Sequence, residues 1–318
     1  MVFHKRLTIV LLGLLCILPF ATPAQTAGTA QNPPAPLGKL VDVGGYGVHL
    51  YCAGTGSPTV VIVGAGFSFN WGLVQPEVTK ITQVCSYDHS GIGWSDDGPK
   101  DSCALRVSEV HTALKNAGIK GPYVLVGHSL GALVARLYAG RYPDEVAGMV
   151  FVDHAMAMPE GMLMLPPPPS DAKVPPQLPP EMPSTPSGGG PVAFGIESDP
   201  NFSKLSARDR ELHLWAMAQT RNQKAMQTNH ELMPKCVAEA DAITGEHSHA
   251  LGDKPLVDVT TVDSARATEL QTKLLSLSQN SKQVIAEKSG HFIIIDRPDV
   301  VVDAISQVVE SVRKNAKL

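Results

Sequence analysis

The sequence predicts an α/β protein in which helices cover both faces of a mostly parallel sheet. Short apolar runs of about five residues alternate along the chain with longer stretches of helical spacing. Residues 59–63 (Thr-Val-Val-Ile-Val) are a continuous β-branched run, which is typical of a strand buried on both faces. A chain of 318 residues is long enough for one large domain of this kind with an insertion.

Eight segments are expected to be strands: 40–43, 48–52, 59–63, 84–87, 123–126, 146–152, 256–260 and 283–286. The turn at 44–47 (Gly-Gly-Tyr-Gly) joins the first two. Helical spacing is found at 105–117, 130–142, 205–242, 265–277 and 300–314. Strands that alternate with helices in this way favour parallel pairing through crossover connections.

One segment interrupts the alternation. Between 159 and 191, 12 of 33 residues are proline, and three more are the glycines at 188–190. Such a composition is incompatible with a central strand or a regular helix. We therefore expect a core of residues 39–154 and 254–318, with residues 155–253 as an insertion that caps the sheet. A linker with surface helices is the alternative for the proline-rich part.

The first 24 residues have the features of a signal peptide. Lys5 and Arg6 precede an apolar stretch at 7–20, and small residues follow at 22–24. The apolar stretch is shorter than the roughly 20 residues that a spanning helix needs. The sequence therefore predicts export to the periplasm or the medium, cleavage after Ala24, and no stable membrane span afterwards. Residues 25–38 are rich in Ala, Pro and Thr and are expected to form a flexible arm.

Charge and cysteine usage exclude several classes. The formal net charge is −4, and basic residues are not interleaved with aromatics, so a nucleic-acid partner is not expected. Removal of the signal peptide leaves Cys52, Cys85, Cys103 and Cys236. None lies in a C-x-x-C motif, so no metal site is expected, and four cysteines in an oxidising compartment favour disulfides. The three possible pairings stay open at this point.

Residues 127–131 (Gly-His-Ser-Leu-Gly) match G-x-S-x-G between an expected strand and an expected helix. A sharp strand-to-helix turn needs small neighbours and lifts the Ser129 hydroxyl clear of the sheet. Ser129 is therefore the candidate nucleophile, and the unpaired N–H of Leu130 is a candidate oxyanion donor. The alternative is a structural Gly/Ser turn.

A serine nucleophile needs a base within hydrogen-bond reach. Among eleven histidines, His291 follows the last expected strand and so lies at the carboxyl edge of the sheet, where open α/β sheets place their sites. His128 is adjacent to Ser129 but is expected to point elsewhere. The alternative for His291 is a structural histidine.

These features together resemble the α/β-hydrolases that carry a cap between the sixth and seventh strands. The resemblance is carried by residues 60–71, 87–95, 127–131, 141–146 and 290–292. It implies a mostly parallel eight-stranded sheet and a carboxylesterase-like serine hydrolase that cleaves an ester or related acyl bond of a small molecule through an acyl-enzyme, without a cofactor. An acyltransferase or C–C bond hydrolase with the same triad, a cofactor-free haloperoxidase, and a non-catalytic binding protein remain alternatives.

The resemblance also assigns residues. It implies a second oxyanion donor from the loop after the third strand, at Gly66 or Phe67. It implies a triad acid at Asp153, after the sixth strand, or at Asp263, after the seventh, although the glycine that family members carry near the latter position is missing here.

The resemblance bears on the cysteines as well. Cys52 and Cys85 fall on strands that are neighbours in this fold, which favours a bond between them. Cys103 and Cys236 are left to link the core to the cap.

Overall fold

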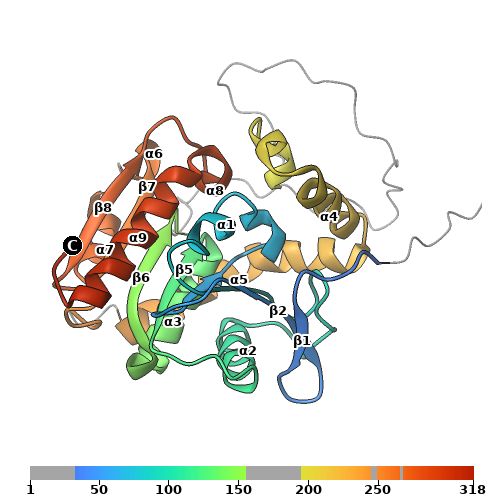
Figure 1. Cartoon of the computed structure of the whole chain (residues 1–318), viewed down its shortest axis with the longest axis horizontal. Helices are drawn as coiled ribbons and strands as arrows, with labels where there is room; N and C mark the ends of the chain where they lie inside the picture. The colour runs from blue at the N-terminus through green and yellow to red at the C-terminus, as the bar shows by residue number, and fades with distance from the viewer. Residues whose placement is uncertain (1–32, 155–194, 245–248, 266–267) are drawn as a thin grey trace, which may run out of the picture. The chain divides into compact units, whose positions relative to one another are not determined.

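The computed structural model describes residues 33–154, 195–244, 249–265 and 268–318, and those from 35 onward belong to one structural unit (Figure 1). Eight strands form one sheet in the order β1-β2-β4-β3-β5-β6-β7-β8. From β3 to β8 the neighbouring strands are parallel, while β2 pairs antiparallel with β1 and β4. The strands are β1 (Lys39–Asp42), β2 (Gly47–Ala53), β3 (Val60–Val63), β4 (Val84–Asp88), β5 (Tyr123–His128), β6 (Val146–Val152), β7 (Leu256–Thr261) and β8 (Ser281–Ala286). The predicted mostly parallel eight-stranded sheet is confirmed.

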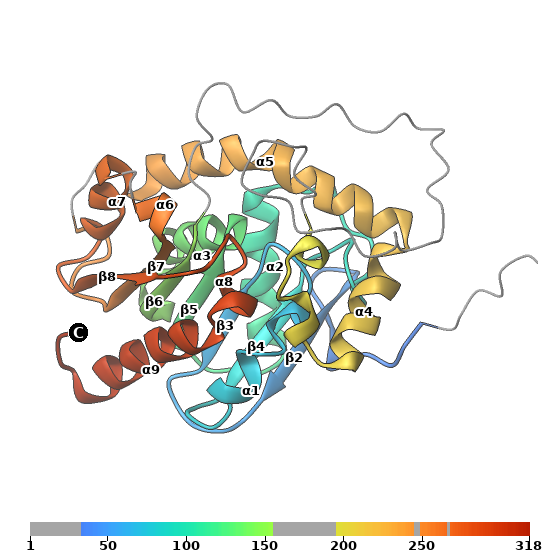
Figure 2. The ribbon, with the colours of Figure 1, turned by 90° about the horizontal axis from the view of Figure 1, so that it is seen from above.

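Helices cover both faces of the sheet (Figure 2). Helices α2 (Cys103–Asn116), α3 (Leu130–Arg141), α5 (Thr220–Thr244) and α7 (Thr268–Leu275) lie on one face. Helices α1 (Gln75–Val78), α8 (Ile293–Asp296) and α9 (Pro298–Lys314) lie on the other. The remaining helices are α4 (Ala207–Met217), α6 (Val262–Ala265) and the 3-10 helices η1 (Ser68–Trp71), η2 (Pro143–Glu145), η3 (Ile196–Ser198) and η4 (Phe202–Lys204).

Successive side chains of a strand point to opposite faces of the sheet. The central strands are covered by helices on both faces, so their side chains are apolar on both sides. In β3, Val61 and Val63 pack under α2 and α3, while Val60 and Ile62 pack under α1 and α9. All four are at most 1% exposed. This double burial explains why the strand has no alternating polar residues.

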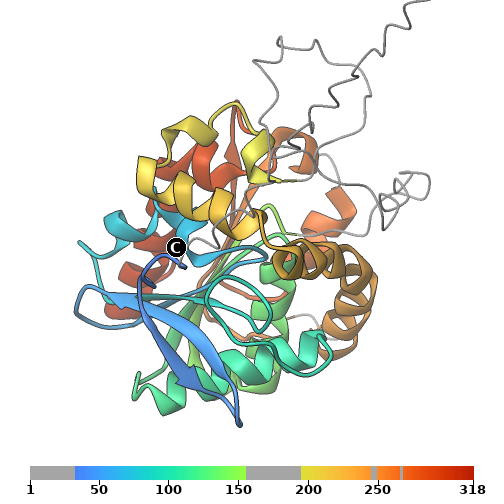
Figure 3. The ribbon, with the colours of Figure 1, turned by 90° about the vertical axis from the view of Figure 1, so that its right-hand side faces the viewer.

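The chain between β6 and β7 forms two described helices where the sequence predicts one helical stretch. Helix α4 ends at Met217, and α5 begins at Thr220 in a different direction, so the expected stretch of residues 205–242 is interrupted. Helix α4, which is yellow in Figure 3, packs against η1 through Leu212 and Ala216. Helix α5 instead runs along α3 and places Leu232, Cys236 and Ala240 in the main core. The boundaries of the predicted cap stay a prediction, and its residues 155–194 lie outside the described residues.

Residues 1–32, which hold the predicted signal peptide and most of the predicted arm, also lie outside the described residues. The last residues before β1 make specific contacts. Leu37 packs against the cluster of Phe67 and Phe69, and the Gly38 N–H donates to His49 Nε2 at 2.9 Å. Within the described ranges, every helix is too short or too polar to span a membrane.

Two disulfides join Cys52 to Cys85 and Cys103 to Cys236. Cys52 and Cys85 are register partners on the neighbouring strands β2 and β4. Cys103 begins α2, and Cys236 lies on α5, with 5.7 Å between their Cα atoms. The second bond therefore ties the chain segment inserted between β6 and β7 to the core.

The Cys103–Cys236 bond closes a loop of 133 residues, and the Cys52–Cys85 bond closes one of 33. A cross-link that closes a longer loop removes more entropy from the unfolded chain, so the double variant Cys103→Ala/Cys236→Ala is expected to lower the free energy of unfolding by about 2–4 kcal/mol. Urea unfolding monitored by circular dichroism measures this. The matched pair Cys52→Ala/Cys85→Ala is expected to lose less, and the reverse ranking would contradict the chain-entropy argument.

Candidate active site

Four chain segments meet at the carboxyl edge of the parallel strands. The loop of residues 64–67 follows β3, Ser129 follows β5, Asp153 follows β6, and His291 lies in the loop after β8. Strands β3, β5 and β6 are direct neighbours in the sheet, and β8 is separated from β6 only by β7. The topology therefore gathers all the segments that carry the candidate residues at one edge.

Ser129 occupies a strained turn between β5 and α3. Its φ of 55° and ψ of −128° lie outside the conformations that non-glycine residues ordinarily adopt. Such a conformation costs about 1–3 kcal/mol and persists only where the surroundings impose it. The Ser129 N–H donates to the Val152 carbonyl oxygen at 3.1 Å, so the turn is attached to the end of β6.

The two glycines of G-x-S-x-G are required by close packing around this turn. A Cβ at Gly127 would collide with the backbone of Ala132, and a Cβ at Gly131 would collide with the Val63 carbonyl oxygen. Both clashes involve main-chain atoms, which cannot move away cheaply. The glycines thus allow helix α3 to start directly against β3 and to present Ser129 at its N-terminus.

His291 forms a short hydrogen bond with Asp153. The distance from His291 Nδ1 to Asp153 Oδ2 is 2.6 Å. Because an ionised carboxylate only accepts hydrogen bonds, Nδ1 carries a proton, and in the neutral imidazole Nε2 is then the nitrogen that holds the lone pair. The Asp153 side chain is 9% exposed and the His291 side chain 45%, so the imidazole reaches outward from a buried acid.

Backbone contacts hold both partners of this pair. Asp153 has a φ of 36°, and its N–H donates to the Val259 carbonyl oxygen of β7 at 2.7 Å. On the other side, the Gly290 N–H donates to Asp296 Oδ2 at 2.7 Å. The hydrogen bond between His291 and Asp153 therefore links two loops that are each anchored independently.

His128 contacts the backbone of His291. The distance from His128 Nε2 to the His291 carbonyl oxygen is 2.9 Å, and the two rings lie 4.7 Å apart. Burial, followed by the charge of His291, lowers the pKa of His128 to about 3, so His128 is neutral and its Nε2–H donates. The structure places the His128 ring against the His291 ring, a contact that only its position before Ser129 in the motif could have suggested.

Among the described residues no hydrogen bond joins Ser129 Oγ to His291. Catalytic hydrogen bonds of this kind are often long in the free enzyme and shorten when substrate binds. Ser129 is 8% exposed, so its hydroxyl lies in a largely enclosed position. The arrangement therefore places a serine beside a histidine and aspartate pair whose orientation is already set.

The backbone N–H groups of the candidate oxyanion donors have no hydrogen-bond acceptor within the described part of the chain. They belong to Leu130, at the first position of α3, and to Gly66 and Phe67, in the loop after β3. The N-terminus of a helix attracts negative charge through such groups. These are the donors that the sequence analysis assigned to an oxyanion hole.

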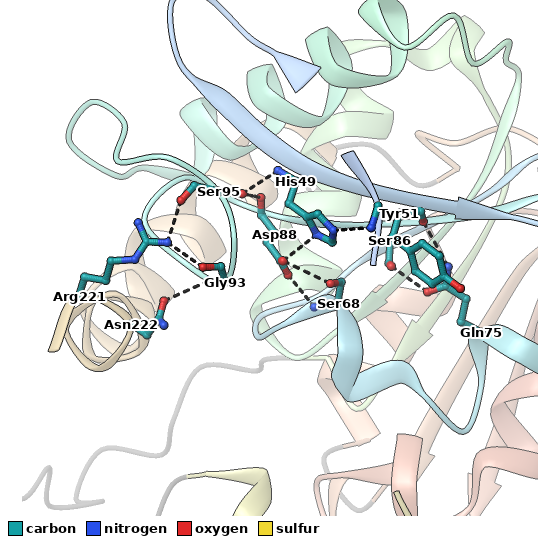
Figure 4. A network of polar contacts seen from close by, with 11 residues as sticks. His49, Tyr51, Ser68, Gln75, Ser86, Asp88, Gly93, Ser95, Arg221 and Asn222 are labelled. Carbon is teal, nitrogen blue, oxygen red and sulfur yellow. Dashed lines mark hydrogen bonds and ion pairs between the residues drawn. The ribbon is translucent and has the colours of Figure 1, made fainter. Parts of the chain in front are cut away.

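A buried network fixes the far end of the loop after β3 (Figure 4). The Ser68 N–H donates to Asp88 Oδ1 at 2.6 Å, and His49 Nδ1–H donates to Asp88 Oδ2 at 2.9 Å. Since the Gly38 N–H donates to His49 Nε2, this histidine is neutral with its proton on Nδ1. His49 and Asp88 are fully buried, and the hydrogen bonds to Asp88 connect the start of η1 with β2 and β4.

Helix α5 joins the same network through two residues at its start. The Arg221 guanidinium donates to the carbonyl oxygens of Gly93 and Ser95, each at 2.8 Å, and the Gly93 N–H donates to Asn222 Oδ1 at 3.1 Å (Figure 4). The segment of residues 88–95 therefore connects η1 with α5.

The alternative acid, Asp263, lies on α6 with an exposed side chain. Of the two carboxylates that the sequence analysis weighed, Asp153 is the one that accepts the hydrogen bond from His291. The roles of both remain proposals that depend on kinetic measurement.

Asp258, on β7, is fully buried, and neither of its carboxyl oxygens has a hydrogen-bond partner in the described structure. Burial, and then the negative charge of Asp153, raise its pKa to about 7. Between about pH 4 and pH 7 the folded protein keeps a proton that the unfolded chain has released, so the free energy of unfolding falls as the pH rises through this window.

The variant Asp258→Asn removes this dependence, because an amide does not ionise. Relative to the wild type, it is expected to gain roughly 2–4 kcal/mol of unfolding free energy between pH 4 and pH 8. Urea unfolding of both proteins at pH 4.5, 6 and 8 measures the change. A difference between the two proteins that stays constant with pH would contradict the prediction.

No group of three or more His, Cys, Asp or Glu side chains suited to a metal ion is found in the described ranges. The donors gathered at the sheet edge are instead a hydroxyl, an imidazole paired with a carboxylate, and backbone N–H groups. Their order along the chain is serine, aspartate, histidine. Together the fold and the arrangement define the class of α/β-hydrolase-type proteins.

Comparison with known proteins establishes the family. The sequence pattern of the family described as alpha/beta hydrolase fold matches residues 58–298, and the chain belongs to this family. A protein of Escherichia coli with the provisional name carbamate hydrolase RutD is 41% identical over 101 residues, which are 30% of this chain and 36% of that protein. The chain spans less than half the length of the curated relatives it matches first, which include an uncharacterized protein of Schizosaccharomyces pombe.

Solved structures show the same fold. A provisionally named acyltransferase from Salmonella enterica aligns with a TM-score of 0.66 at 18% identity, over 87% of this chain and 98% of that one. The meta-cleavage product hydrolase CumD of Pseudomonas fluorescens aligns with a TM-score of 0.60 at 19% identity, over 86% of this chain and 98% of that one. At these identities the likeness shows the fold alone.

Proposed function

We propose that the protein is a serine hydrolase that cleaves an ester or related acyl bond through an acyl-enzyme. The observation that carries the proposal is the 2.6 Å hydrogen bond between His291 and Asp153 beside the strained turn that presents Ser129. This bond leaves His291 Nε2 free to take the Ser129 proton. The family and the names of its relatives support a hydrolase.

In the first half of the reaction, Ser129 Oγ attacks the carbonyl carbon of the substrate while His291 Nε2 accepts the hydroxyl proton. Asp153 keeps His291 in the required tautomer and stabilises the imidazolium that forms. The N–H groups of Leu130 and of Gly66 or Phe67 bind the oxygen anion of the tetrahedral intermediate. His291 then protonates the leaving group, and the acyl chain stays bonded to Ser129.

In the second half, a water molecule attacks the acyl-enzyme while His291 takes a proton from that water. The second tetrahedral intermediate collapses, the acid product leaves, and Ser129 regains its proton. Each step uses groups of the chain itself, and we expect no cofactor. The segment between β6 and β7 is proposed to cover the substrate as a cap, since α4 already packs against η1.

We also infer that the protein is exported. The charged and apolar stretches of residues 1–24 support a cleaved signal peptide, and two disulfides favour an oxidising compartment. Detection of a mature chain that begins at Gln25 in the periplasm or the medium would test this. An uncleaved chain in the cytoplasm would contradict it.

Hydrolysis of p-nitrophenyl esters from acetate to palmitate tests the proposed function. We expect turnover by the wild type, with a chain-length optimum that reports the size of the acyl site. Addition of a primary alcohol distinguishes an acyltransferase, which would form the alkyl ester in preference to the acid. Absence of both turnover and labelling by a fluorophosphonate would contradict the proposal and favour a binding protein.

A further inference from the structure

We propose that Asn229 of helix α5 is a positioning residue that aims the Gly66 N–H at the carbonyl oxygen of the substrate. The inference rests on the proposed function and extends it to a residue outside the triad and the oxyanion donors. Asn229 is 164 residues distant in sequence from the loop it contacts, and it is 9% exposed.

The contact acts on the peptide group that contains the proposed donor. Asn229 Nδ2 donates to the Ala65 carbonyl oxygen at 2.7 Å. In a trans peptide the C=O and the following N–H point in opposite directions. The bond therefore turns the Ala65 carbonyl toward α5 and the Gly66 N–H away from α5. That N–H has no acceptor among the described residues, and Gly66 follows the strand that pairs with β5, which leads to Ser129.

A buried cation determines which way the Asn229 amide faces. Arg106 Nη2 donates to Asn229 Oδ1 at 2.7 Å. A guanidinium has donors and no acceptor, so the amide oxygen must face Arg106 and the amide nitrogen must face Ala65. Arg106 in turn donates to both oxygens of Asp101, from Nε at 3.0 Å and from Nη2 at 2.5 Å. Its side chain is 2% exposed, so water does not compete for these bonds.

The same two helices are also joined covalently. Cys103 lies three residues before Arg106 on α2, and Cys236 lies seven residues after Asn229 on α5. The disulfide and the Arg106–Asn229 hydrogen bond together limit sliding of α5 along α2. Asn229 is thereby held at a fixed position along α2, opposite the loop after β3.

The variant Asn229→Asp tests the proposal. Aspartate keeps an oxygen for Arg106 but replaces the donor with a second oxygen, which repels the Ala65 carbonyl. The matched control is Gln75→Glu on α1. Gln75 is 3% exposed, its Oε1 accepts from the Ser86 hydroxyl at 2.7 Å, and its Nε2 donates to the backbone carbonyl of Tyr51 at 3.2 Å. The measurement is kcat and KM for a p-nitrophenyl ester, with thermal unfolding of each variant.

We expect Asn229→Asp to lower kcat by roughly 10- to 100-fold with KM changed less than about threefold. A misdirected oxyanion donor loses more of its stabilisation of the transition state than of its stabilisation of the bound substrate. Gln75→Glu is expected to keep kcat within about threefold of the wild type at a similar loss of Tm, since the Tyr51 carbonyl belongs to strand β2 and to no oxyanion donor. A merely structural role would lower kcat equally in both variants. Should Asn229→Asp not fold, Asn229→Ala with Gln75→Ala as control replaces the pair.

The outcomes distinguish a failure of this inference from a failure of the proposed function. If turnover depends on Ser129, two results overturn this inference and leave the proposed function intact. One is a kcat of Asn229→Asp equal to that of the wild type, and the other is an equal loss of kcat in Asn229→Asp and in its control. Wild-type protein whose turnover does not depend on Ser129 overturns the proposed function and this inference with it.

Discussion

Replacement of Ser129 by alanine is expected to lower kcat for ester hydrolysis by roughly 10⁵- to 10⁶-fold. The variant loses the hydroxyl that is proposed to form the acyl-enzyme, while His291, Asp153 and the proposed oxyanion donors are left unchanged. The remaining rate then reflects attack by water in a site that still binds the oxyanion. Initial rates of p-nitrophenyl ester hydrolysis, with enzyme concentrations raised for the variant, measure the ratio.

Ser129→Gly provides the control for folding. Glycine adopts a positive φ without strain, so this variant is expected to unfold at the same free energy as the wild type or up to about 1 kcal/mol higher. It is expected to be as inactive as Ser129→Ala. An inactive protein of unchanged stability assigns the loss to chemistry, whereas activity within tenfold of the wild type in either variant would contradict the assignment of Ser129.

Asp153→Asn carries the second largest expected effect, a fall in kcat of roughly 10⁴-fold. The amide is nearly the same size as the carboxylate, so the packing at the end of β6 is preserved. It no longer stabilises an imidazolium, and its N–H₂ group favours the tautomer in which His291 Nε2 is protonated and unable to act as a base. Steady-state kinetics of both proteins at pH 8 measure the loss.

Asp263→Asn is the matched control for Asp153→Asn. The substitution is identical, and the side chain lies exposed on α6 at the other position that α/β-hydrolases use for the acid. We expect its kcat within about twofold of the wild type, as for most surface substitutions. A large loss in Asp263→Asn with little loss in Asp153→Asn would show that the hydrogen bond between His291 and Asp153 is not the catalytic one.

Much of the fold follows from local pattern. The run at residues 59–63 predicts a doubly buried strand because every side chain is β-branched and all but Thr59 are apolar, and β3 is such a strand. The motif around Ser129 predicts a strand-to-helix turn because its glycines leave space, and the structure shows which backbone atoms would otherwise collide. Both inferences use residues that are close together in the sequence.

Features that depend on distant residues could not be predicted in the same way. The choice between Asp153 and Asp263 depends on which of the two chain segments approaches His291. Because both segments follow a buried parallel strand, the local sequence does not distinguish them. The contact of Asn229 with Ala65 has no signal in the sequence, since an asparagine within a helix has nothing that marks its partner. The break between α4 and α5 arises because α4 packs against η1 while α5 packs along α3, and no proline or glycine marks the change of direction.

The most direct test of the central claim is to trap the acyl-enzyme. A p-nitrophenyl ester is mixed with the protein, the reaction is stopped in acid within the first turnovers, and the digested chain is examined by mass spectrometry. The account predicts the mass of the acyl group on the peptide that contains Ser129, and its absence from Ser129→Ala. Turnover with no acyl group on Ser129, or with the group on another residue, would contradict the proposed mechanism.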